Sequence, residues 1–135
     1  MQLDTVAIVQ STWQSVAAIA PQAAALFYKN LFEADPALKL LFKGDMAEQG
    51  KKLMHMIGAA VGKLNDLPTL VPILQNLGKR HTDYGVQPAH YDTVGAALLL
   101  TLQQGLGDAF TPAAKAAWGE VYGVMAKVMI EASAT

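Results

Sequence analysis

The stretch TLVPILQNLGKRHTDYG, residues 69–85, places an imidazole at the end of an apolar helical ridge. Four of its residues are spaced by four, three and four positions: Leu70, Leu74, Leu77 and His81. At about 100° per residue they share one stripe of a helix. One interpretation is a half-buried histidine near a helix C-terminus, favoured by the helix dipole. The other is an axial ligand to a flat apolar cofactor, with the second ring N–H held by a carbonyl near Leu77 or Gly78.

The composition around this stretch is that of one small apolar domain, residues 1–135. Such a length is enough for a real core and too short for two ordinary domains. Hydrophobic residues make up 53% and charged residues 16%, which excludes intrinsic disorder. A net charge of −1 gives no strong positive field, so we expect no nucleic-acid partner. Cysteine is absent, which excludes disulfides, thiolate metal sites and cysteine nucleophiles.

The N-terminal sequence MQLDTVAIVQ has no basic region of the kind that opens a secretory signal. The chain also has no uncharged apolar stretch near the roughly 18 residues that a membrane span requires. We therefore expect a cytoplasmic protein without a membrane span.

Helical periodicity recurs along the chain, and proline and glycine mark the ends of each segment. The expected helices cover residues 4–19, 21–34, 46–64, 69–83, 88–106 and 112–132, with a short turn at 37–42. Asp45 and Thr111 are the expected N-cap residues of two of them. Because the sequence shows no alternating strand pattern, we predict an all-α domain of six or seven helices.

Familiar catalytic motifs are absent from the sequence. The three histidines, His55, His81 and His90, form no metal-ligating motif, and there is no nucleotide-binding loop or nucleophile elbow. A second apolar stripe carries one amide at its open end: Gln49, Leu53, Ile57 and Ala60. For Gln49 the plainer interpretation is a surface residue. For Tyr28 and Phe42 the plainer interpretation is hydrophobic packing.

Short motifs run in order along the whole chain: FYKNLF (27–32), a proline at 36, LF (41–42), EQGKKL (48–53), KRH (79–81), GV (85–86), AHYDTVG (89–95) and AWGEVYG (117–123). In this order and spacing they resemble the bacterial single-domain globins. These include the Vitreoscilla-type haemoglobin and the globin module of flavohaemoglobins. The resemblance implies a globin fold whose helices enclose a non-covalently bound haem b.

The resemblance also assigns roles to individual residues. It implies that His81 is the iron ligand and that Tyr28 and Gln49 form the distal polar pair. Further residues expected at the cofactor are Phe42, Leu53, Leu77, Val86 and Tyr91. Lys52 lies about 60° around the helix from Gln49, where it could pair with a haem propionate, ligate the iron itself or be simply solvated, as is most common for such a residue.

In flavohaemoglobins a glutamate of the last helix completes the proximal network. Counting without a gap from Trp118, that position falls on Ser133, and Glu131 lies nearby at a different helical angle. The sequence leaves open whether either residue takes the glutamate's place.

The function that we expect is reversible binding of oxygen at a pentacoordinate iron, with NO and CO as further ligands, in oxygen transport or storage. The alternative is a nitric oxide dioxygenase that depends on a separate reductase, because this chain carries no flavin domain. A third possibility is a helical interaction module without haem. Val121, Val124 and Val128 could belong to a core or to a homodimer, so monomer and dimer are both compatible with the sequence.

Overall fold

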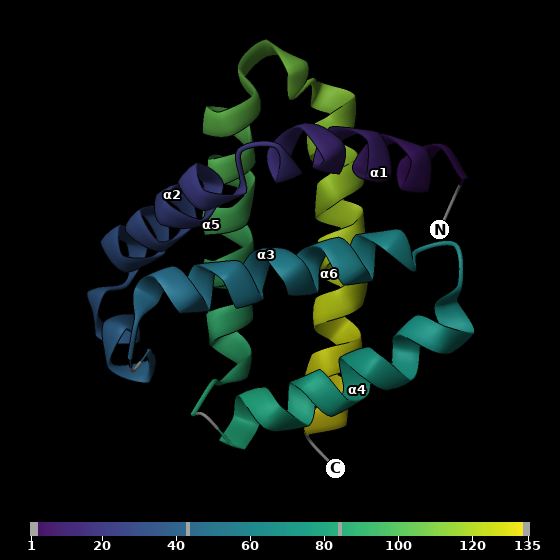
Figure 1. Ribbon diagram of the computed structural model, residues 1–135. Coiled ribbons are helices and arrows are strands. Elements are labelled where there is room, and N and C mark those ends of the chain that lie inside the picture. Colours follow the sequence, from purple (N-terminus) through teal and green to yellow (C-terminus); the bar gives the residue numbers. More distant parts are fainter. Residues whose placement is uncertain (1–2, 43, 84, 134–135) are drawn as a thin grey trace.

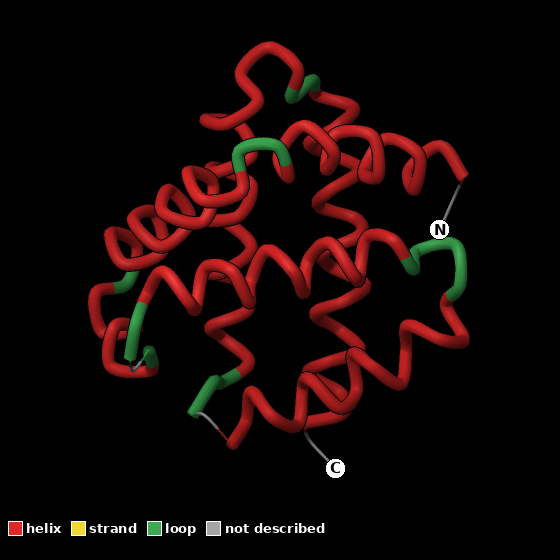
Figure 2. Tube along the Cα trace, in the orientation of Figure 1, coloured by secondary structure: helices red, strands yellow, loops and turns green. Residues whose placement is uncertain are grey.

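The computed structural model describes residues 3–42, 44–83 and 85–133, and these residues are almost entirely helical (Figures 1 and 2). The elements are α1 (Leu3–Ala17), α2 (Ala20–Ala34), the 3₁₀-helix η1 (Pro36–Leu41), α3 (Met46–Gly62), α4 (Leu67–Asp83), α5 (Pro88–Leu106), the 3₁₀-helix η2 (Gly107–Ala109) and α6 (Pro112–Ser133). No strand occurs in the described ranges. The predicted all-α fold is confirmed.

The expected N-caps are present. The Asp45 carboxylate accepts a hydrogen bond from the Ala47 amide at 2.8 Å, and the Thr111 hydroxyl accepts one from the Ala114 amide at 3.1 Å. Helix α4 begins two residues earlier than the sequence predicted, at Leu67 rather than residue 69. The reason is that Pro68 lies in the first turn of the helix, where a missing backbone N–H has no cost.

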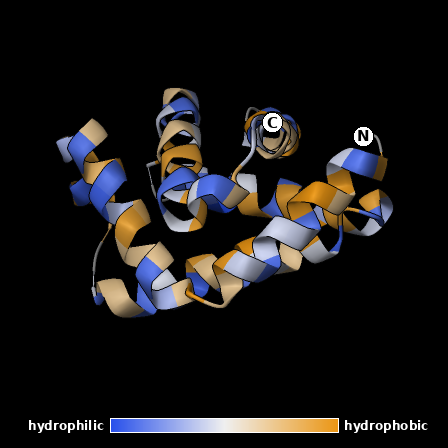
Figure 3. Cartoon of the chain, turned by 90° about the horizontal axis from the view of Figure 1, so that it is seen from above, coloured by the Kyte–Doolittle hydropathy of each residue, from blue (hydrophilic) through white to orange (hydrophobic). Residues whose placement is uncertain are grey.

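The helices are arranged in crossed layers. Helices α5 and α6 pack together, α1 and α4 cross α6, and α2 crosses α5. Helix α3 packs against α1 and α2 and lies on the same side of the α5–α6 pair as α4 (Figure 1). Seen from above, hydrophobic and hydrophilic residues are interspersed along the helices (Figure 3). Helices α3 and α4 lie on the same side of the α5–α6 pair, but they are not closely packed against each other.

The crossing of α4 and α6 depends on a glycine. A Cβ added at Gly78 would overlap the backbone carbonyl of Met129, so only glycine allows this approach. Leu70 and Leu74 fill the same crossing and are buried. This close contact anchors the helix that carries His81.

The core continues behind this crossing. Trp118 of α6 is fully buried, and its indole N–H donates to the Thr12 hydroxyl of α1 at 2.8 Å. None of the described helices is both long enough and apolar enough to cross a membrane.

Candidate functional site

His81 lies in the last turn of α4, and its Nδ1 is 2.8 Å from the Leu77 carbonyl oxygen. The sequence predicted this backbone contact one turn back. Since a carbonyl only accepts, Nδ1 carries the proton and Nε2 carries the lone pair. Burial lowers the pKa of His81, and the bond to the Leu77 carbonyl opposes this only in part. The imidazole is therefore neutral at neutral pH, which is the form that ligates a metal.

Tyr91, in the first turns of α5, forms one wall beside this imidazole. Its ring centroid lies 6.5 Å from that of His81, with 28° between the ring planes, and the residue is buried. The Tyr122 hydroxyl of α6 donates to the Tyr91 carbonyl oxygen at 2.6 Å. The Tyr122 ring lies against Gly95, where an added Cβ would come within 2.6 Å of Tyr122 Cε2. Tyr91 is thus held in place from α6.

Sequence reasoning missed Tyr122. The sequence feature that could have identified it is its position four residues after the buried Trp118, which places it on the inward side of α6. Burial, with contributions from Tyr91 and Asp92, raises the pKa of Tyr122. Its hydroxyl therefore stays protonated and able to donate.

Neither candidate for the family's proximal glutamate supplies a buried carboxylate. The Ser133 hydroxyl donates to the Ile130 carbonyl of its own helix at 2.7 Å. Glu131 is exposed. The surroundings of His81 are thus built from its imidazole and two tyrosines, Tyr91 and Tyr122.

The opposite side of the candidate site is an aromatic cluster. The Tyr28 ring lies 5.4 Å from Phe42 in an edge-on contact and 5.9 Å from Phe32 in a stacked one. These contacts join α2 to the end of η1. Phe42 is half-buried, whereas Tyr28 is only 8% exposed.

The hydroxyl of Tyr28 has no hydrogen-bond partner among the described residues, although every fully enclosed polar side-chain atom in those ranges has one. The hydroxyl therefore reaches accessible space. Burial raises the pKa of Tyr28 to about 12, so the group stays protonated. It is a neutral donor available to a ligand.

The stripe predicted on α3 faces inward. Gln49, Leu53, Ile57 and Ala60 are all half-buried. Next to Gln49, a Cβ added at Gly50 would lie 3.0 Å from Ala24 Cβ and 3.9 Å from Tyr28 Cε2. The segments that carry Tyr28 and Gln49 therefore cross at close range.

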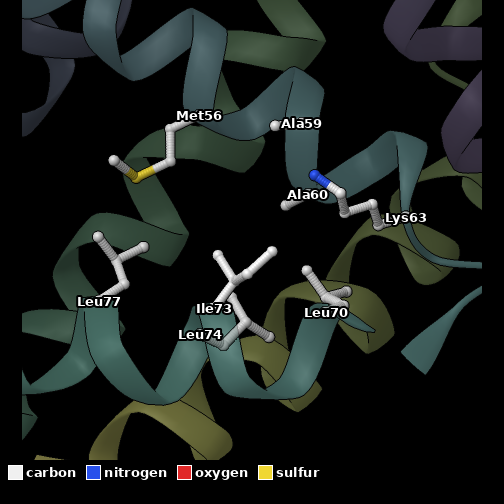
Figure 4. A pocket seen from close by; sticks show the side chains of 8 residues that line it. All are labelled: Met56, Ala59, Ala60, Lys63, Leu70, Ile73, Leu74 and Leu77. Carbon is white, nitrogen blue, oxygen red and sulfur yellow. The ribbon is translucent and has the colours of Figure 1, made fainter. Parts of the chain in front are cut away.

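Between α3 and α4 lies an apolar cavity of about 50 Å³ (Figure 4). It is lined by residues of both helices and by Lys63, which directly follows α3: Met56, Ala59, Ala60, Lys63, Leu70, Ile73, Leu74 and Leu77. Ligand pockets are typically about 300–1,000 Å³, so this volume alone does not hold a large cofactor. The fit of a flat apolar group rests on chemistry. The α3 stripe and Leu77 of α4 stay half-buried, Leu70 and Leu74 are buried at the α4–α6 crossing, and a neutral imidazole lies at the end of the α4 stripe.

A larger groove of about 510 Å³ runs between α2 and α3. Tyr28, Phe32, Gly50 and Met54 contribute to its walls, and no residue of α4 does. Tyr28 thus borders both the groove and the aromatic cluster.

The other predicted cofactor contacts divide into two groups. Leu53, Leu77 and Val86 are half-buried, and the Val86 amide donates to the His81 carbonyl at 2.9 Å, which turns the chain directly after the imidazole. Lys52 is exposed on α3. The described residues contain no group of three or more histidine, cysteine or acidic side chains that could hold a metal ion.

The family model described as Globin matches residues 25–129. The matched region includes Tyr28, Gln49, His81, Tyr91 and Tyr122, and so contains both sides of the site.

Proposed function

The chain belongs to the globin family, whose members bind haem, and we propose that it takes up oxygen reversibly at a haem b held by His81. When bound, the haem would supply an iron that can take up a diatomic ligand such as O₂, NO or CO. The observation that carries the proposal is the neutral His81 imidazole, oriented by the Leu77 carbonyl at 2.8 Å. A hydrogen bond of this kind fixes the tautomer and makes the other nitrogen a better ligand.

On the proximal side, the tyrosines orient the histidine. Tyr91 limits rotation of the His81 ring because it lies nearly parallel to it. Tyr122 holds the Tyr91 backbone through a 2.6 Å hydrogen bond. These residues keep the imidazole in one orientation, in which His81 would hold the iron.

On the distal side, Tyr28 and Gln49 select among ligands by charge. Both supply hydrogen-bond donors. A bond from such a donor to a charge-bearing acceptor contributes about 1.5–3 kcal/mol, or roughly ten- to a hundredfold in dissociation. Oxygen accumulates more negative charge on its outer atom than CO does, and so gains more from Tyr28.

The apolar stripes of α3 and α4 exclude water and bury the faces of the cofactor. Burial of apolar surface contributes about 25 cal/mol per Å², so these walls supply most of the binding free energy. We propose Leu53, Leu77, Val86 and Phe42 as the wall contacts. Lys52 is exposed, and pairing with a propionate would contribute at most about 1 kcal/mol.

We further propose that the chain is one globin domain of the bacterial single-domain type, acting in the cytoplasm. The support is the sequence resemblance in the motifs that carry Tyr28, Gln49 and His81.

Titration of the purified chain with hemin tests this function. We expect an intense absorption band that saturates at one haem per chain and shifts when the reduced protein binds CO or oxygen. His81→Ala should lose the ordered spectrum, whereas His55→Ala should keep it, because His55 is exposed on α3. A colourless wild-type chain, or equal spectra of the two variants, would contradict the proposal.

A further inference from the structure

A buried amide joins α2 to α5 behind the distal aromatic cluster. Asn30 is 6% exposed, and its side-chain nitrogen donates to the Thr101 hydroxyl at 3.1 Å and to the Gln104 side-chain oxygen at 2.9 Å. Thr101 is 3% exposed and donates in turn to the Ala97 carbonyl at 2.7 Å. Both N–H groups of the Asn30 amide are therefore used.

This cluster lies in an otherwise apolar contact. Its neighbours along α2 and α5 include Phe27, Leu31, Leu98 and Leu102, all buried. Burying an amide is unfavourable unless its hydrogen bonds are made, and such bonds have strict geometry. Apolar packing tolerates small rotations of a helix, but a polar pair of this kind does not. The Asn30–Thr101 pair therefore selects one rotation of α2 about its axis.

Tyr28 is carried by the same helix, two residues before Asn30. At about 100° per residue the two side chains point to nearly opposite sides of α2. Tyr28 meets Phe42 on the one side, and Asn30 meets α5 on the other. We infer that Asn30 and Thr101 form a positioning device that fixes the rotation of α2 and so aims the Tyr28 hydroxyl. This inference rests on the proposed role of Tyr28 toward a haem ligand.

The size of the effect follows from the helix geometry. A hydroxyl about 8 Å from the helix axis moves by about 1.4 Å when the helix turns by about 10°. Hydrogen bonds from a hydroxyl are made within about 2.5–3.0 Å, so this displacement is enough to break one. Aromatic contacts at 5.4 Å and 5.9 Å lose little energy over the same displacement, although the distances between the rings change. These contacts by themselves therefore cannot fix the direction of the Tyr28 hydroxyl.

A paired substitution separates positioning from stability. Asn30→Leu alone leaves the Thr101 hydroxyl without its donor and lowers the melting temperature. In the double variant Asn30→Leu/Thr101→Val both partners become apolar groups of similar shape, which restores most of the stability. It does not restore the directional bond. Thr101→Ser keeps the hydroxyl and is the conservative control.

Oxygen dissociation from the haem-loaded protein and ring contacts in the purified full chain are the two readouts. We expect the double variant to melt near the wild type, to release oxygen about tenfold faster with CO release little changed, and to weaken the nuclear Overhauser contact between Tyr28 and Phe42. In a Tyr28→Phe background the same pair of substitutions should add nothing to oxygen release. Thr101→Ser should behave as wild type.

Two outcomes separate a failure of the positioning role of Asn30 from a failure of the proposed function of Tyr28. An unchanged ring contact and unchanged oxygen release in the double variant would overturn the positioning role. A weakened ring contact together with no effect of Tyr28→Phe on oxygen release would leave Asn30 as the positioning residue of Tyr28 and refute the distal role of Tyr28.

Discussion

The proximal and distal sides of this site are held by different forces. On the proximal side, His81 and Tyr91 are fixed by hydrogen bonds of 2.8 Å and 2.6 Å that involve backbone carbonyls, and α4 is anchored on α6 at Gly78. On the distal side, Tyr28 is surrounded by aromatic rings, and its hydroxyl reaches accessible space. The directional bonds that act on its helix lie on the far side, at Asn30.

This difference separates two tasks. Holding a metal requires one imidazole geometry, which bonds to the backbone provide. In the proposed function Tyr28 donates to a diatomic ligand, and this requires that its hydroxyl is not already used in a structural hydrogen bond. Substitutions on the proximal side should therefore change cofactor retention, and those on the distal side should change ligand release.

The largest effect is expected from Gly78→Ala on the proximal side. The new methyl group would overlap the Met129 backbone carbonyl, which cannot move aside as a side chain would. We expect a loss of about 3 kcal/mol in the free energy of unfolding, measured with urea, together with weaker haem retention. Gly119→Ala is the matched control because nothing lies within 4 Å of its Cβ. It should be neutral or stabilise α6 by about 0.5–1 kcal/mol. Equal effects of the two variants would refute the role of Gly78.

Tyr28→Phe tests the distal side. Removal of the hydroxyl should accelerate oxygen dissociation roughly ten- to a hundredfold in stopped-flow measurements, with a much smaller change for CO. Haem retention should not change, since the ring contacts with Phe32 and Phe42 remain. An unchanged oxygen off-rate would remove Tyr28 from the site.

Tyr122→Phe makes the same chemical change on the proximal side. Loss of one hydrogen bond to the Tyr91 carbonyl should accelerate haem transfer to an acceptor protein by roughly two- to tenfold. Oxygen release should change less than in Tyr28→Phe. Ser133→Ala is the control, because the Ser133 hydroxyl bonds only within its own helix. If Tyr122→Phe and Tyr28→Phe changed haem transfer and oxygen release by the same factors, the two sides of the site would not have separate tasks.

The smallest effect concerns pH. Because burial lowers the pKa of His81 in the folded chain, the unfolded chain takes up its proton first as the pH falls. The contribution of His81 to stability is complete above the unfolded value of about 6.5 and is lost progressively below it. In urea unfolding of the apoprotein, His81→Gln should lessen the decline in stability between about pH 7 and about pH 5, and His55→Gln should not. The opposite ranking of the two variants would contradict a buried, neutral His81.

Much of the fold could be predicted because its signals are local. Helical periodicity, the caps at Asp45 and Thr111 and the ridge that ends in His81 all depend on residues within a few turns of one another. The contact of His81 with the Leu77 carbonyl followed for the same reason. The start of α4 was misplaced because a proline in a first turn has the same sequence signal as a helix break.

The missed features join residues far apart in the sequence. Tyr122 reaches Tyr91 across 31 positions, and Asn30 reaches Thr101 across 71. Nothing in the local sequence of either residue specifies its partner, which depends on how α2, α5 and α6 pack. The roles of all the predicted site residues toward a cofactor stay predictions: His81, Tyr28, Gln49, Phe42, Lys52, Leu53, Leu77, Val86 and Tyr91.

The most direct test of the central claim is the iron–histidine stretching band in the resonance Raman spectrum of the reduced, haem-loaded protein. We predict a band that shifts when the histidines carry nitrogen-15 and that persists in His55→Gln/His90→Gln. The same band should vanish in His81→Gly and return when imidazole is added. A nitrogen-15-sensitive band that survives in His81→Gly without added imidazole would show that another histidine holds the iron, and would contradict the account.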